Sequence, residues 1–228
     1  MKSPYPLDET LGLSYYCTES EGIGGRLKAE PSDFIVEEIA DYTSRADDGP
    51  YLICRLTKKN WDQQRAIREI SNRLGMSHQR IGFAGTKDKR AVTTQFISIY
   101  KGDPAAVRAL AIPDMTIEPV LTSQQQISLG DLQGNRFQIT LTGIREGAAG
   151  RIREDLLPGM AEGIPNYYGY QRFGVTRPVT HLTGLALLKG EYEEAVVTFV
   201  SMPSAGEEEE PAAGRAFYRD TRDAKEAL

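Results

Sequence analysis

The stretch GFAGTKDKRAVTTQ, residues 82–95, says more than any other about the fold and chemistry of this chain. Its two glycines permit a tight backbone path, and Asp88 then stands between Lys87, Lys89 and Arg90. Cations near a carboxylate favour its ionised form. An aspartate kept as an anion serves as a nucleophile, a metal ligand or a salt-bridged scaffold residue. Ion pairs at loops are common, so the scaffold alternative stays open.

The segments on both sides of this stretch alternate between strand-like and helix-like patterns. Strands are expected at 26–40 with a turn at Pro31–Asp33, and at 51–58, 93–101 and 134–144. Helices are expected from Asn60 to Gly75, from Asp103 to about Ile112, at 150–165 with a bend or break at Pro158, and at 178–202 in two pieces separated by Lys189–Gly190. Residues 1–20 are expected to form an extended arm. This order predicts an α+β protein with a mixed sheet.

The apolar positions in these segments predict which faces are buried. Phe34 and Val36 share one face of the strand at 26–40. Leu52, Cys54 and Leu56 share one face of the strand at 51–58. On the strand at 134–144, Phe137, Ile139 and Leu141 face one way. The first helix has a stripe of Trp61, Ile67, Ile70 and Leu74, with Asn60 as N-cap, Gln63 as capping-box partner and Gly75 as the stop.

Length and composition exclude several classes of protein. The 228 residues, 40% of them hydrophobic, suffice for one large or two small domains with a real core. No run of eighteen apolar residues exists, and the N-terminal residues lack the apolar segment of a secretory signal. Cys17 and Cys54 lack metal-site spacing, so a reduced cytoplasmic protein is expected. His78 and His181 lie far apart, which argues against a metal site, and no Walker-type phosphate loop occurs.

Charge is distributed unevenly along the chain. The net charge is −5, but residues 51–110 carry twelve Lys and Arg against four Asp and Glu, so this segment is +8 and the remainder −13. A basic centre in an acidic protein indicates a localised site for an anion, with a well-solvated helix face as the alternative.

Four stretches resemble motifs of the TruD family of tRNA pseudouridine synthases. The family pattern A-G-x-K-D-x-x-A-x-T-x-Q is matched by Ala84, Gly85, Lys87, Asp88, Ala91, Thr93 and Gln95. The other stretches are NYYGYQRFG (166–174), KAEPSDFIVEE (28–38) and the less specific GNRF (134–137). All four occur in the family's order.

The resemblance implies an isomerase that converts uridine to pseudouridine, typically at position 13 of tRNA. The reaction breaks the C1′–N1 bond, turns the uracil and joins C1′ to C5. It involves no redox change, group transfer or net hydrolysis, so the resemblance implies no cofactor and no metal. The implied partner is tRNA, and neither a membrane nor a small-molecule cofactor is expected.

The resemblance also assigns roles to single residues. It makes Asp88 the catalytic aspartate, attacking sugar or base or accepting a proton, and Lys28 its basic partner; the alternative for Lys28 is an exposed strand lysine. A flipped uracil is expected to stack on Tyr168, often Phe in the family, unless this ring belongs to the core. Asn166 is expected to hydrogen-bond the Asp88 loop or the uracil edge. The expected phosphate contacts are Lys87, Lys89, Arg90 and Arg172, while Glu38, Thr93 and Gln95 are expected to have structural roles.

The resemblance further implies a domain organisation. Residues 1–174 are expected to form a catalytic domain with an incomplete core, and residues 175–228 the beginning of an inserted second domain with a mobile acidic segment at 204–215. Family members are considerably longer, so the chain is expected to be a fragment or a truncated homologue.

Two alternatives from other classes stay open. One is a truncated, non-catalytic RNA-binding homologue. The other is a retaining glycosidase that pairs Asp88 with Glu38, which requires carboxyl groups about 5–5.5 Å apart.

Overall fold

The computed structural model describes residues 1–161, 163–203, 209–223 and 225. The chain divides into two compact units, one formed by Ile23–Ala148 and the other by Met1–Gly22 together with Ala149–Leu228. We call them the sheet unit and the helical unit.

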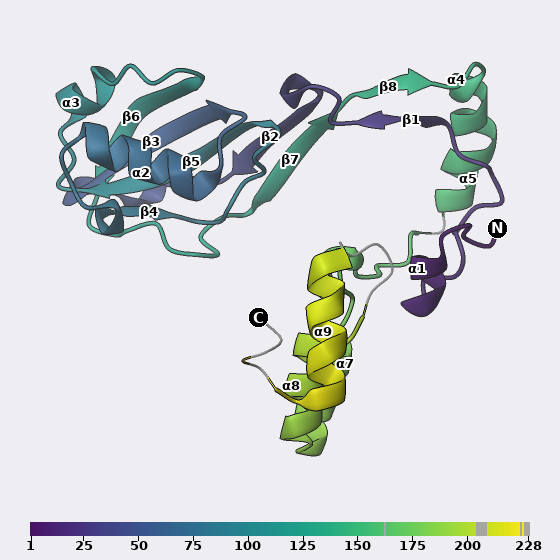
Figure 1. Ribbon diagram of the computed structural model, residues 1–228. Coiled ribbons are helices and arrows are strands. Elements are labelled where there is room, and N and C mark those ends of the chain that lie inside the picture. The colour runs from purple at the N-terminus through teal and green to yellow at the C-terminus, as the bar shows by residue number, and fades with distance from the viewer. Residues whose placement is uncertain (162, 204–208, 224, 226–228) are drawn as a thin grey trace. The chain divides into compact units, whose positions relative to one another are not determined.

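A six-stranded mixed sheet forms the centre of the sheet unit (Figure 1). Its strands are β2 (Phe34–Ile39), β3 (Ala46–Lys59), β4 (Ile81–Phe83), β5 (Val92–Tyr100), β6 (Met115–Ser123) and β7 (Gly134–Ile139). The order is β6-β3-β5-β2-β7, with β4 paired to β5; β2 and β5 are parallel and the other pairs antiparallel. The predicted α+β class is confirmed, although β4 and β6 were not foreseen.

Helices α2 (Gln63–Arg73) and α3 (Pro104–Arg108) cover one face of this sheet (Figure 1). The inward residues predicted for β3 are buried there: Leu52, Cys54 and Leu56. They pack against Ile67 and Ile70 of α2, so strand alternation and helix periodicity predict the main core correctly. The opposite face of the sheet holds a smaller cluster of Tyr42, Ile53, Ala84 and Ile127.

The start of α2 differs from the prediction. Asp62, not Asn60, is the N-cap, because its carboxylate accepts the Arg65 backbone N–H at 3.0 Å. Asn60 instead has φ +57° and turns the chain out of β3. Gly75, with φ +63°, follows the helix end as predicted. The start was misplaced because an aspartate only two residues further on competes for the same role.

The expected strand at 134–144 is two strands in two sheets. β7 pairs with β2 in the main sheet, whereas β8 (Leu141–Ile144) pairs with β1 (Gly24–Leu27) in a separate antiparallel ribbon. The switch occurs at Thr140, whose N–H donates to the Asp33 carbonyl oxygen at 2.7 Å. The predicted apolar face is therefore not buried: Phe137, Ile139 and Leu141 are all exposed, and Leu141 lies in the other sheet.

The helical unit contains short helices (Figure 1). They are α1 (Pro6–Thr10), α4 (Ala148–Arg151, which begins in the sheet unit), a π-helical turn (Ile152–Leu156), α5 (Leu157–Met160), α6 (Tyr170–Phe173), α7 (Thr180–Lys189), α8 (Tyr192–Ser201) and α9 (Glu209–Thr221). The break between α7 and α8 at Gly190, with φ +80°, matches the prediction. Of the described helices, none has the length and hydrophobicity needed to cross a membrane.

Three expectations about this unit need correction. Residues 1–20 are not an extended arm, because they contain α1, whose buried Asp8 accepts a hydrogen bond from Tyr170. The helix predicted for 150–165 ends at Met160, and a π-helical turn at Ile152–Leu156 interrupts its α-helical pattern just before Pro158. In the segment expected to be mobile, residues 209–215 begin α9, while 204–208 lie outside the described residues.

The expected domain boundary at residue 174 does not coincide with the division into compact units. That division falls after Gly22 and after Ala148, so the stretch at 166–174 belongs to the helical unit. The assignment of residues 1–174 to a catalytic domain stays a prediction.

Close backbone approach, rather than a tight turn, explains the first glycine of the 82–95 stretch. A Cβ on Gly82 would overlap the Ile127 carbonyl oxygen and lie 2.8 Å from Ser98 Oγ. At Gly85 the nearest such atom is 3.9 Å away. The two glycines therefore differ in what they tolerate.

We predict that Gly82→Ala lowers the free energy of unfolding by about 1–3 kcal/mol, because the added methyl overpacks the site. Gly85→Ala is the matched control and should change it by less than about 0.5 kcal/mol. Urea unfolding of both variants measures the difference, and equal values would contradict the close-approach explanation.

Candidate active site

Asp88 lies on the loop between β4 and β5 and forms an ion pair with Lys28, which follows β1. Lys28 Nζ donates to Asp88 Oδ1 at 2.5 Å. The ammonium also lies 3.8 Å from the centre of the Phe34 ring. The lysine and aspartate side chains are 24% and 45% exposed, so the pair is open to solvent on one side. The expected contact of Lys28 with Asp88 is therefore present, and a free strand lysine is not what the structure shows.

The backbone of Lys28 is in an unusual conformation. Its φ is +55°, in the left-handed region that non-glycine residues avoid. This conformation costs on the order of 1 kcal/mol. It turns the chain sharply after Leu27, the last residue of β1. Strain of this kind persists where surrounding contacts hold it and is frequent at functional sites.

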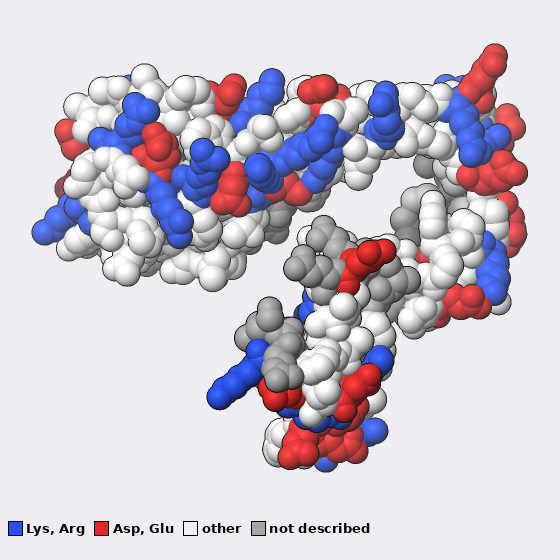
Figure 2. Space-filling view, in the orientation of Figure 1, with Lys and Arg blue, Asp and Glu red and all other residues white. Residues whose placement is uncertain are grey.

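A hollow of about 500 Å³ lies beside this ion pair. We call it the basic hollow, lined by Arg26, Leu27, Lys28, Ala29, Glu30 and Arg90. Figure 2 shows Lys and Arg side chains along this part of the sheet unit.

The charges around the basic hollow favour an anionic ligand. Arg26 is exposed, and Arg90 donates to the Ala29 carbonyl oxygen. Glu30 supplies the one carboxylate in the lining; its backbone N–H donates to Asp33 Oδ2 at 2.8 Å, and its carbonyl oxygen accepts the Asp33 N–H at 3.0 Å. Sequence reasoning missed Arg26; the available signal was its position two residues before Lys28, on the same side of an extended segment.

Lys87 does not lie where the phosphate prediction requires. Its Nζ donates to Glu38 Oε2 at 2.7 Å, and the two side chains are 4% and 0% exposed. The other Glu38 oxygen accepts the Phe96 N–H at 3.3 Å. We therefore correct the assignment: Lys87 compensates a buried carboxylate and is not offered to a phosphate. A buried charge needs such a partner.

The same pair decides between two enzyme classes. Both Glu38 oxygens are occupied and the side chain is fully buried. Lys28, not Glu38, stands at Asp88. The Asp88–Glu38 pair of a retaining glycosidase is therefore excluded, and the structural role expected for Glu38 is confirmed.

Two further residues, Gln95 and Lys58, hold the Asp88 loop. A structural role was expected from the sequence for Gln95 alone. Gln95 is fully buried in β5, and its Nε2 donates to the Gly85 carbonyl oxygen at 3.4 Å. Lys58, which sequence reasoning did not single out, is 1% exposed, and its Nζ donates to the carbonyl oxygens of Trp61 at 2.8 Å and Asp88 at 3.1 Å. Burial lowers the pKa of Lys58 to about 8; the charges of Asp62 and Asp88 oppose this shift and that of Lys87 assists it.

The other predicted residues differ in location. Lys89 and Arg90 are exposed on the Asp88 loop, as a phosphate contact requires. Asn166, Tyr168 and Arg172 lie in the helical unit and are exposed. The Tyr168 ring is 67% exposed and faces the Arg172 guanidinium at 5.1 Å. The core alternative for this ring is therefore wrong, while the roles of these five residues stay predictions.

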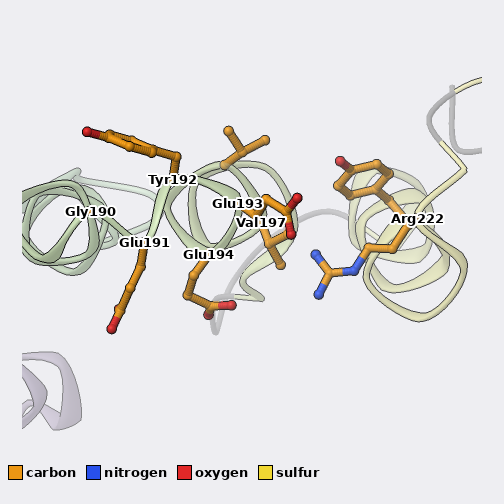
Figure 3. A pocket seen from close by; sticks show the side chains of 9 residues that line it. Gly190, Glu191, Tyr192, Glu193, Glu194, Val197 and Arg222 are labelled. Atoms are coloured by element: carbon orange, nitrogen blue, oxygen red, sulfur yellow. The ribbon is translucent and has the colours of Figure 1, made fainter.

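A separate hollow of about 920 Å³ lies in the helical unit between the start of α8 and the end of α9. Figure 3 shows Arg222 pointing toward Glu193 and Val197 there. Its lining includes none of the residues predicted for the active site. Over the described residues, no three His, Cys, Asp or Glu side chains gather as a metal-binding group.

Comparison with known proteins identifies the family of this chain. The family model for tRNA pseudouridine synthase D (TruD) matches residues 10–228. The chain belongs to the TruD family. The resemblance that the four stretches carry is thus confirmed.

Individual relatives of this TruD-family chain are similar over nearly all of it. "Probable tRNA pseudouridine synthase D" of Archaeoglobus fulgidus is 44% identical over 222 residues, 97% of this chain and 53% of that protein. A protein of the same name from Halobacterium salinarum is 38% identical over 237 residues, 100% of this chain and 54% of that protein. The chain spans about half the length of the curated relatives it matches.

A solved structure supports the fold. The crystal structure of the protein described as tRNA pseudouridine synthase D (TruD) from Methanosarcina mazei superposes with a TM-score of 0.85 at 39% identity. The superposition covers 99% of this chain and 53% of that one. The α+β class predicted from the sequence is thus shared with a TruD structure.

The buried ammonium of Lys58 predicts a pH-dependent stability. Its pKa is about 8 in the folded chain against 10.5 ordinarily, so between these values the unfolded chain binds more protons than the folded one. The free energy of unfolding therefore rises with pH across this window, by about 1.4 kcal/mol per unit and roughly 3 kcal/mol in all.

Urea unfolding from pH 7 to 10.5 measures this effect as the difference in the free energy of unfolding between wild type and Lys58→Met. As the pH rises, this difference should shift in favour of wild type by roughly 3 kcal/mol, because the variant lacks the titrating group. Lys59→Met, the neighbouring exposed lysine, should follow wild type. Parallel curves for all three proteins would contradict the burial of a charged ammonium.

Proposed function

We propose that this protein is a tRNA pseudouridine synthase that isomerises uridine, at position 13 of tRNA, to pseudouridine. The observation that carries the proposal is the Lys28–Asp88 ion pair, 2.5 Å long, at the edge of the basic hollow. Both residues stand at the positions that match TruD motifs, and the chain belongs to that family.

The chemistry requires an anionic group at the reacting nucleoside. The C1′–N1 bond breaks and a C1′–C5 bond forms, while C5 loses a proton and N1 gains one, so no net oxidation occurs. Asp88 acts as the anion, either as nucleophile or as proton acceptor. In both routes the ammonium of Lys28 lies 2.5 Å from this carboxylate and pairs with its negative charge.

Substrate recognition combines a stacking ring with backbone contacts. A uridine inside folded RNA must leave its stack before C1′ can be reached, and the exposed ring of Tyr168 supports a stacking role for it. Asn166 is proposed to bind the uracil edge or the Asp88 loop. Lys89, Arg90 and Arg172, all exposed, are proposed to contact phosphates, and Arg26 joins them as a residue of the basic hollow.

The proposal places the activity in the cytoplasm, where thiols stay reduced. Cys17 and Cys54 are both free thiols, which is compatible with such a compartment.

The central test is Asp88→Asn in the whole protein as cells make it. Wild type should release tritium from tRNA labelled at uridine C5, and Asp88→Asn should lower this rate by on the order of a thousandfold, because the amide is neither a base nor an anion. The affinity for tRNA, measured by filter binding, should change less than about threefold.

The matched control for this test is Asp48→Asn, which removes the charge of an exposed aspartate at the start of β3 and should keep wild-type turnover. Lost binding with retained turnover in Asp88→Asn would refute the role of Asp88. A wild type that binds tRNA and releases no tritium would favour the non-catalytic RNA-binding alternative.

Salt dependence tests the phosphate contacts. The affinity of wild type for tRNA should fall steeply with salt, and Arg26→Ala and Arg90→Ala should each reduce the slope of log K against log salt by up to about one. Arg108→Ala is the control, because α3 lies at the far end of the sheet unit from β1 (Figure 1), and should leave the slope unchanged. A flat wild-type profile would argue against phosphate contact altogether.

A further inference from the structure

We propose that Lys58 is a positioning residue for catalysis, which holds the backbone at Asp88 from the core side and thereby sets where the Asp88 carboxylate stands. This inference rests on the proposed function, in which Asp88 acts on the nucleoside. Lys58 does not touch substrate in this proposal; it acts through Asp88.

The contacts of Lys58 join two loops. The residue stands near the end of β3, and its ammonium bonds the carbonyl oxygens of Trp61, just before α2, and of Asp88. The backbone adds a parallel link, because the Asn60 N–H donates to the Ala91 carbonyl oxygen at 3.0 Å. The turn between β3 and α2 thus carries the loop of Asp88.

Side chains tie this loop to its surroundings at Lys87, through Glu38, and at Asp88, through Lys28, and hydrogen bonds hold several of its backbone carbonyl oxygens. Gln95 holds the carbonyl oxygen of Gly85 at its start, and Asn60 holds that of Ala91 at its end. Lys58 supplies the hydrogen bond to the Asp88 backbone itself. The ion pairs of Lys87 and Asp88 hold side chains, whereas Lys58 holds the main chain at Asp88. A displacement of about 1 Å at a reacting group can lower a rate about a hundredfold.

Asp88 is consequently held by two lysines at opposite ends. Lys28 approaches its carboxylate from the partly exposed side, and Lys58 binds its carbonyl oxygen from the buried side. A buried ammonium is unfavourable unless acceptors surround it. Replacing the long cation by an apolar residue would keep the core filled but release the carbonyl, which explains what lysine provides at this position.

Charged groups on neighbouring residues act on the Lys58 ammonium. Asp62 and Asp88 attract its ammonium and Lys87 repels it. Lys87 is itself neutralised by Glu38, so the neighbourhood does not leave Lys58 facing an uncompensated cation.

The test compares Lys58→Met with Lys59→Met in the whole protein. Both variants remove one ammonium from β3 with the same substitution, but only the first removes the link to Asp88. We expect kcat for tritium release to fall about a hundredfold in Lys58→Met, with KM for tRNA within about threefold and a melting temperature that stays well above the assay temperature. In Lys59→Met, kcat should stay within about twofold of wild type.

A second measurement does not depend on activity. Backbone order parameters of residues 86–90, from ¹⁵N relaxation without RNA, should fall from the rigid range near 0.85 toward 0.6 in Lys58→Met and stay unchanged in Lys59→Met.

Unchanged order parameters in Lys58→Met would overturn the inference, as would a variant that melts early and loosens throughout the sheet unit, because Lys58 would then be merely structural. Unaltered kcat would overturn it as well. If wild type forms no pseudouridine, the proposed function fails, and the order parameters still decide whether Lys58 holds the Asp88 backbone.

Discussion

The attraction between Lys28 and Asp88 is the interaction on which the candidate site depends. The isomerisation needs the carboxylate as an anion, and the Lys28 ammonium lies 2.5 Å from it. The pair also joins segments far apart in sequence, one following the β1–β8 ribbon and one preceding β5. Because a two-stranded ribbon alone is only marginally stable, this contact helps to fix the ribbon against the sheet.

Three lysines near the Asp88 loop have three different environments. Lys28 is partly exposed on a carboxylate, Lys58 is buried on two carbonyl oxygens, and Lys87 is buried on Glu38. Part of the +8 charge of residues 51–110 is therefore internal. The sequence correctly indicated a local concentration of cations, but it could not distinguish those that face solvent from those that support the fold. The surface available to RNA is consequently less positive than the count suggests, and it includes Arg26, which lies outside that segment.

Periodicity predicted the core well where one face of an element is buried. The alternation through Leu52, Cys54 and Leu56 is correct, and extended by one step it places Lys58 on the same inward face, where the structure has it. That signal was available, but a lysine is normally expected in solvent, so the pattern was not followed past Leu56. The motif match predicted the contact between Lys28 and Asp88, which the structure has. These residues are 60 positions apart, so no local pattern connects them.

Other features depended on contacts that no local pattern contains. The division at Thr140 is set by a hydrogen bond to Asp33, roughly a hundred residues earlier, and a continuous run of alternating apolar residues hides it. The partner of Lys87 is Glu38, on a different strand, whereas the sequence offered Asp88 next to it. Asp62 and Asn60 are both good capping residues, and only the left-handed backbone at Asn60 separates their roles.

The left-handed conformation of Lys28 sets stability against function at one position. Glycine would adopt φ +55° without steric penalty, so a screen that selects only for thermal resistance would favour it there. The selected protein would lose the ammonium that pairs with Asp88. Engineering for robustness should therefore hold position 28 fixed and seek its gains elsewhere in the chain.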